Sequence, residues 1–138
     1  MSRALATLTR VRRLEVDRLR RDLVAAEGRI ASIRDEQARL DATLAEERAG
    51  VGDDPLALAA FGTFGIRLAG ERRRLDDLVS DAVRERERLY EALAEACAEV
   101  KKYETASAAR QQREREEREH AEALILDDMA LQRHARSA

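Results

Sequence analysis

The stretch Ala49-Gly50-Val51-Gly52-Asp53-Asp54-Pro55 divides the sequence into two long segments that both have the pattern of a helix. Glycine accepts the left-handed conformation that follows a helix C-terminus, aspartate caps a helix N-terminus, and proline fits a first helical turn. The three residue types occur here in the order that ends one helix and begins another. The sequence therefore predicts a helix over about 3–48, a turn at 49–55 and a second helix over about 56–135.

The segment before the turn carries an apolar stripe whose steps alternate between three and four residues. Such a stripe is the face that one helix of a coiled coil presents to its partner. Its positions are Val16, Leu19, Leu23, Ala26, Ile30, Ile33, Gln37, Leu40 and Leu44. Upstream, an apolar stripe continues in a different phase through Leu5, Leu8, Val11 and Leu14. This change of phase predicts a stutter near Arg12.

The segment after the turn repeats the pattern with one polar position. Its stripe consists of Leu75, Val79, Ala82, Arg86, Leu89, Leu93, Ala96, Val100 and Tyr103. Two stripes separated by a tight turn cover each other when the chain folds back on itself. We therefore expect an all-α fold, in which residues 1–138 form a single two-helix antiparallel coiled-coil hairpin with a longer, overhanging second helix.

The end of the second helix is predicted to lack a partner inside the chain. The first helix spans about 45 residues and the second about 80, so that residues from about 106 onward overhang. The overhang begins with the polar segment RQQREREEREH at 110–120. It ends with an apolar return made of Ala121, Leu124, Ile125, Leu126, Met129 and Leu131 around Asp127 and Asp128. An apolar stripe without an internal partner predicts a docking site, with dimerisation through the same stripe as the alternative.

The composition is typical of a rod with a narrow apolar seam. Aromatic residues make up 3% of the chain and charged residues 39%, so that bulk for a filled core is missing. The single Cys97 cannot form an internal disulfide. No apolar run approaches the ~20 residues of a membrane span, and no signal peptide is recognisable. These features predict a cytoplasmic protein without membrane insertion.

The motifs that support catalysis are absent from the sequence. The glycines between Gly50 and Gly70 lack the Lys-Ser or Lys-Thr ending of a phosphate-binding loop. His120 and His134 are fourteen residues apart, and with the distant Cys97 they do not have the spacing of a metal site. We expect a protein that is not an enzyme and that binds neither a metal nor a cofactor.

The charge is unevenly distributed although the net charge is only −2. The first 21 residues contain Arg3, Arg10, Arg12, Arg13, Arg18, Arg20 and Arg21. Such a segment can bind an acidic protein surface, or it can be a solvated helix face. Nucleic-acid binding is disfavoured because Glu15 and Asp17 interrupt the basic run and the apolar seam passes through it.

Three short stretches occur in order along the second helix. The first is Phe61-Gly-Thr-Phe64-Gly-Ile-Arg-Leu68, the second is Val100-Lys101-Lys102-Tyr103-Glu104, and the third is Leu126-Asp127-Asp128-Met129-Ala130. Together they resemble the FliJ family, the small coiled-coil component of the bacterial flagellar type III export apparatus. The layout of a shorter helix, a polar turn and a longer helix extends this resemblance over the whole chain.

The resemblance implies a non-catalytic stalk protein at the membrane-embedded export apparatus. Its partners would be the flagellar export ATPase ring, the cytoplasmic domain of the export gate protein, and export chaperones. We expect a cytoplasmic protein, peripherally associated with the membrane, that is a monomer more readily than a homodimer. The alternatives are the equivalent stalk protein of a virulence type III secretion system and a self-associating coiled-coil scaffold.

The resemblance also implies two sets of partner-binding residues. The residues for the gate are Phe61, Phe64, Leu68 and Glu71, of which Glu71 stands where the family usually has a small residue. The residues for the ATPase ring are Arg10, Arg13, Arg20, Leu124, Asp127, Asp128 and Leu131. Asp128 replaces the usual glutamate, and Leu124-Ile125 replace basic residues, so that apolar docking is favoured over charge at this end.

Overall fold

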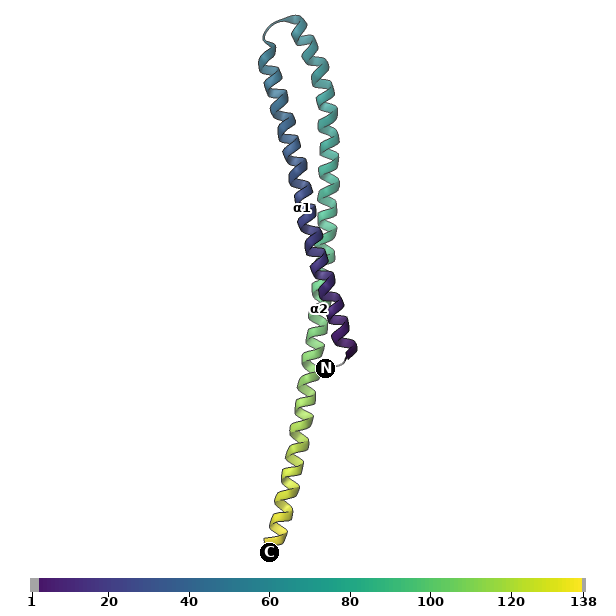
Figure 1. Ribbon diagram of the computed structural model, residues 1–138, viewed down its shortest axis with the longest axis vertical. Coiled ribbons are helices and arrows are strands. Elements are labelled where there is room, and N and C mark those ends of the chain that lie inside the picture. Colours follow the sequence, from purple (N-terminus) through teal and green to yellow (C-terminus); the bar gives the residue numbers. More distant parts are fainter. Residues whose placement is uncertain (1–2, 138) are drawn as a thin grey trace. The chain divides into compact units, whose positions relative to one another are not determined.

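The computed structural model describes residues 3–137, which form two α-helices (Figure 1). Helix α1 spans Arg3–Val51 and helix α2 spans Pro55–Ser137. The predicted all-α helical hairpin is confirmed. Helix α1 ends at Val51 and not near Arg48, because the residue that leaves the helical conformation is Gly52, with a φ of 64°. An L-residue is strained at this φ, so the second glycine of the turn is required by the backbone.

Asp54 caps the N-terminus of the second helix. Its carboxylate Oδ1 accepts a hydrogen bond from the backbone N–H of Leu56 at 3.1 Å, and its carbonyl accepts the N–H of Leu58 at 2.9 Å. Pro55 follows as the first residue of α2, where a missing N–H costs nothing because that N–H has no partner inside a helix. The turn chemistry expected from the sequence is thus used at Gly52, Asp54 and Pro55.

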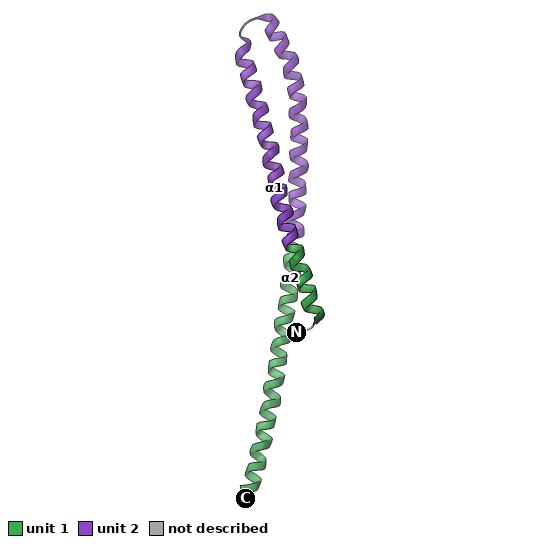
Figure 2. Cartoon of the chain, in the orientation of Figure 1, with its two compact units in different colours: residues 1–16, 95–138 green, residues 17–94 purple. Residues whose placement is uncertain are grey.

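The chain divides into two compact units (Figure 2). Residues 17–94 form the hairpin unit, which contains the turn and the adjoining parts of both helices. Residues 1–16 and 95–138 form the terminal unit. In the terminal unit, an ion pair between Arg13 of α1 and Glu104 of α2 joins the two helices.

In the hairpin unit, contacts between charged and polar side chains show that the helices are antiparallel. Arg86 reaches Glu27, Asp76 accepts a hydrogen bond from Gln37 at 2.7 Å, and Arg72 pairs with Asp41. The residue number on α2 falls as the number on α1 rises. This is the order that a chain folded back on itself requires.

The core of the hairpin unit is a narrow seam. Its buried side chains are Leu19, Leu23, Ala26 and Ile30 from α1 and Leu75 from α2. The predicted stripe continues toward the turn through Ile33, Gln37, Leu40 and Leu44, which are only half-buried. The helices therefore pack most closely away from the turn and more loosely near it.

Arg86 is the polar member of the seam on α2. Its Nη1 lies 3.5 Å from Glu27 Oε2, and the Tyr90 hydroxyl donates to Glu27 Oε1 at 3.2 Å. The Nε of Arg86 is buried and has no hydrogen-bond partner among the described residues. A polar side chain at one seam position favours a single register, because any shift would leave its charge without Glu27.

In the terminal unit the seam continues with the same alternating steps of three and four residues, but some of its positions are polar. Thr9 and Ser107 are buried, and the Thr9 hydroxyl donates to the Leu5 carbonyl at 2.9 Å. The stutter predicted near Arg12 is therefore wrong. The outward residues of the predicted stripe, Leu8, Val11 and Leu14, are 46%, 51% and 62% exposed.

Arg12 occupies a seam position that the apolar pattern did not indicate. The steps of four and three run in phase from Leu5 through Thr9 and Arg12 to Val16. Arg12 forms an ion pair with Glu15 at 2.8 Å. Hydrogen bonds to Glu15 and then to Tyr103 raise the pKa of Arg12. The charge of Arg12 is thus retained at the seam by two partners, one from each helix.

The last part of α2 has almost no buried side chain. All described residues from 108 to 137 are exposed except Glu114, which is half-buried. Contacts within the helix occur between Arg110 and Glu114 at 3.3 Å and between Gln112 and Glu116 at 3.0 Å. Such pairs four residues apart stabilise an isolated helix by about 0.2–0.5 kcal/mol each.

Neither helix, over the residues described, has an apolar stretch suited to crossing a membrane.

Candidate functional site

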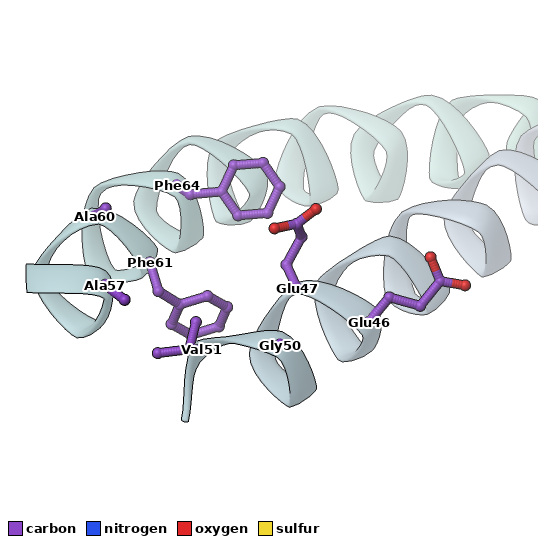
Figure 3. A pocket seen from close by; sticks show the side chains of 8 residues that line it. All are labelled: Glu46, Glu47, Gly50, Val51, Ala57, Ala60, Phe61 and Phe64. Carbon is purple, nitrogen blue, oxygen red and sulfur yellow. The ribbon is translucent and has the colours of Figure 1, made fainter. Parts of the chain in front are cut away.

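A cleft of about 530 Å³ opens between the two helices next to the turn of the hairpin unit (Figure 3). It is lined by Glu46, Glu47, Gly50, Val51, Ala57, Ala60, Phe61 and Phe64. Phe61 and Phe64 are the two phenylalanines of the sequence, and both are half-buried. The turn-end cleft, as we call it, is therefore an apolar hollow with two carboxylates beside it.

The cleft is open because the seam of α1 carries a glutamate where an apolar side chain would close it. The steps of three and four that pass through Leu40 and Leu44 next reach Glu47 and then Val51. Glu47 is exposed, and the ring of Phe64 points from α2 toward it (Figure 3). A carboxylate that has no cationic partner keeps its hydration, because burying it against a ring would be costly. The two helices therefore do not pack against each other beside Glu47.

The four residues that the family resemblance predicts to bind the gate lie on one face of α2. Phe61, Phe64, Leu68 and Glu71 are spaced by three, four and three residues, and all four are half-buried. This face is the one that α2 turns toward α1. A partner that contacts Phe61 and Phe64 must therefore enter the turn-end cleft.

Two arginines lie over the phenylalanine rings. The guanidinium carbon of Arg48 is 5.8 Å from the centroid of Phe61, and that of Arg67 is 5.4 Å from the centroid of Phe64. At these distances the cations are attracted by the rings. The side chains of Glu46 and Glu47, by contrast, form no hydrogen bond or ion pair with any described residue.

Glu71 is already paired inside the chain. The Nε of Arg74 donates to both carboxylate oxygens of Glu71 at 3.1 Å. The hydrogen bonds from Arg74, aided by its charge, lower the pKa of Glu71. Glu71 is thus held as a carboxylate by its own helix, where Arg74 is its partner.

A second, shallower hollow of about 250 Å³ lies beside Glu71. It is lined by Glu36, Arg39, Leu40, Thr43, Glu71 and Leu75. Glu36 and Thr43 precede Gly50 of the turn-end cleft at intervals of seven residues, which return to nearly the same side of a helix. The two hollows therefore open along the same flank of α1.

The acidic and apolar residues that the family resemblance predicts to bind the ATPase ring share one face of α2 in the terminal unit. Leu124 and Leu131 are 57% and 69% exposed, and Asp127 and Asp128 are exposed between them. The Nε2 of Gln132 donates to Asp128 Oδ2 at 3.4 Å. Ile125, Leu126 and Met129 are also exposed, and 3.6 residues per turn place them around the helix from Leu124, beyond Asp128.

The assigned arginines are more dispersed. Arg10 is exposed and Arg13 is paired with Glu104 in the terminal unit, whereas Arg20 belongs to the hairpin unit. No hydrogen bond or ion pair between described residues joins Arg10 or Arg13 to the 124–131 segment. The structure thus groups the residues at the end of α2 but does not connect the arginines with them.

Sequence reasoning missed Glu46, Glu47 and Val51. The signal was available, because the spacing that identifies Leu40 and Leu44 reaches Glu47 and Val51 when it is continued into the turn. Among the described residues, no group of three or more histidine, cysteine or acidic side chains is placed to hold a metal ion. The hollows offer apolar walls and carboxylates, which bind apolar and cationic groups.

In a comparison with protein-family models, the chain matches the family described as Flagellar FliJ protein over residues 1–138. No curated protein and no solved structure matches the chain significantly.

Proposed function

The chain belongs to the FliJ family of non-catalytic flagellar export components, and we propose that it is the stalk of that apparatus. In this proposal the end of α2 binds the export ATPase ring, and the turn-end cleft binds the cytoplasmic domain of the export gate protein. The protein also handles export chaperones and is held at the membrane by these partners. The flagellar description of the matching family favours this system over a virulence secretion system.

The observation that carries the proposal is the uncovered apolar end of α2. Five large apolar side chains, Leu124, Ile125, Leu126, Met129 and Leu131, are all more than half exposed within two helical turns. Contiguous exposed apolar side chains mark protein-binding surfaces, and an amphipathic helix binds in a groove or a pore of its partner. We assign this surface to the ATPase ring.

The action of such a stalk is mechanical and allosteric. A protein that binds the assembled ring but not its free subunits stabilises the ring by mass action. Helix α2 runs without interruption from Pro55 to Ser137, so the same helix carries the residues proposed for the gate and those proposed for the ring. Occupation of both sites would link the ATPase to the gate through one continuous element.

The gate assignment predicts that Phe64→Ala and Leu68→Ala each weaken binding of the purified gate domain by about tenfold. Truncation of a central apolar anchor at an interface commonly costs more than about 1 kcal/mol. Binding can be measured by titration calorimetry, with circular dichroism to show that helicity is retained. Leu56→Ala is the matched control, because Leu56 is an apolar residue of α2 near the turn that is 80% exposed and lies outside the cleft. Wild-type gate affinity in both Phe64→Ala and Leu68→Ala would refute this role.

A further inference from the structure

The turn-end cleft combines apolar walls with an acidic border. Residues 46–54 contain four carboxylates, Glu46, Glu47, Asp53 and Asp54, and a single arginine, Arg48. Of these, Asp54 caps α2 and Arg48 lies over the ring of Phe61. Glu46 and Glu47 line the cleft and have no partner among the described residues.

We propose that the cleft receives an apolar side chain of the gate protein that is flanked by a lysine or arginine, and that this cation pairs with Glu46 and Glu47. This inference rests on the proposed function, because it names the chemistry of the segment that the gate presents. The apolar side chain packs against Phe61 and Phe64. The neighbouring cation stays at the border, where the carboxylates are exposed.

The size of the cleft suits one such side chain. Its volume of about 530 Å³ lies within the range of about 300–1,000 Å³ of pockets that hold small ligands. Ala57 and Ala60 have short side chains and leave room beside the rings. An aromatic or branched aliphatic side chain can therefore enter this space, where it occupies only part of the volume.

Glu47 explains why the space is not filled by the chain itself. It stands at a seam position opposite Phe64, where leucine or isoleucine would complete the packing between the helices. The hairpin therefore leaves the ring of Phe64 half-buried at this level. The apolar side chain of the partner packs against Phe64, as a leucine in place of Glu47 would. The neighbouring lysine or arginine of the partner pairs with the carboxylates that keep the cleft open.

The carboxylates of Glu46 and Glu47 disfavour an acidic partner segment at this border, since Arg48 and Arg67 lie over the rings and not beside these two carboxylates. Two adjacent unpaired carboxylates repel a third, whereas a lysine or arginine is attracted from a distance and oriented on arrival. Attraction between exposed charges is screened by salt over about 10 Å at 0.1 M ionic strength. Binding through this border must therefore weaken as the salt concentration rises.

The test measures the affinity of the purified gate domain for the full-length chain over a series of salt concentrations. The double variant Glu46→Gln and Glu47→Gln keeps side-chain size and removes both charges. We expect about fivefold weaker binding at low salt and a flatter salt dependence. The matched control is Glu91→Gln with Glu95→Gln, which removes the same charge from two exposed positions of α2 outside the cleft.

A second variant tests the steric part of the inference. Glu47→Leu places an apolar side chain at the seam position, so we expect a higher unfolding temperature together with loss of gate binding. A Glu47→Leu chain that is more stable and still binds the gate as wild type does would overturn the inference.

The outcomes separate this inference from the proposed function. If Phe64→Ala weakens gate binding while the glutamine pair has the affinity and salt dependence of the wild type, the inference fails and the gate contact stands. If the control pair weakens binding as much as the cleft pair, the effect is one of net charge and the inference also fails. If Phe64→Ala and Leu68→Ala both bind as wild type does, the gate contact itself is wrong.

Discussion

Replacing Leu75 with alanine is expected to lower the free energy of unfolding by about 2–5 kcal/mol, the usual cost of removing a buried leucine side chain. Leu75 is 2% exposed, and it is the one large apolar side chain of α2 in the buried seam of the described part of the hairpin unit. A two-helix seam has no second layer from which side chains can move in to fill the space. The loss is a large share of the stability of about 5–15 kcal/mol that is typical of folded domains.

Urea unfolding followed by circular dichroism measures this loss. Leu78→Ala is the matched control, since Leu78 is three residues further along the same helix and is 40% exposed. Partly exposed positions outside a core usually change stability by less than about 0.5 kcal/mol. Equal losses in the two variants would show that Leu75 does not hold the seam.

A stalk that stabilises the assembled ring, as proposed above, is expected to stimulate the export ATPase. Deletion of residues 110–138 is expected to abolish this stimulation and to leave gate binding unchanged. Among the deleted residues that the structure describes, only Glu114 is even half-buried, so that their removal takes no core away. The deletion does remove the whole apolar surface from Leu124 to Leu131. The unfolding midpoint of the shortened chain should therefore stay close to that of the full chain.

A deletion limited to residues 121–138 controls for the polar segment before them. If the apolar surface is the part that binds, this shorter deletion reduces ATPase stimulation as much as the longer one. Stimulation that persists after the longer deletion would remove the assignment of this end to the ring. Gate binding, measured on the same samples, shows whether the hairpin unit remains intact.

The seam was predictable because it follows from spacing alone. Leu19, Leu23, Ala26 and Ile30 are buried as the alternation of three and four residues indicates. Side chains at these intervals return to one side of a helix, whatever the rest of the chain does. The turn was predictable for a similar reason, since a positive φ at Gly52 and a cap at Asp54 are local requirements.

The phase of the N-terminal segment was not predictable from its own residues. Leu8, Val11 and Leu14 are more apolar than Thr9 and Arg12, yet the latter pair occupies the seam. The helix is continuous, so its phase is set by the buried positions further along. The Thr9 hydroxyl donates a hydrogen bond to the Leu5 carbonyl, and Arg12 donates one to Glu15. These bonds satisfy both polar side chains at seam positions.

The candidate site, too, could be predicted only in part from the sequence. Sequence reasoning singled out Phe61, Phe64 and Leu68 through a family resemblance, and their common face is evident from their spacing. It did not reveal that this face points toward α1, because that depends on the pairing of two segments far apart in the sequence. The cleft depends further on Glu47, whose effect appears only when its position opposite Phe64 is known.

The two helices cover each other's stripes within one molecule, which leaves the turn-end cleft and the end of α2 uncovered. Cross-linking tests this arrangement directly. In a Cys97→Ser background, which removes the exposed native thiol, cysteines replace Gln37 and Asp76, whose side chains are 2.7 Å apart. A short bismaleimide is then added to a dilute sample.

The control pair is Gln37→Cys with Glu91→Cys, in which the second cysteine lies fifteen residues, or roughly 22 Å, further along α2. We expect the first pair to give a cross-linked monomer in high yield and the control pair to give little product. Cross-links that join two chains, or equal yields from the two pairs, would contradict an antiparallel hairpin and support a self-associating scaffold.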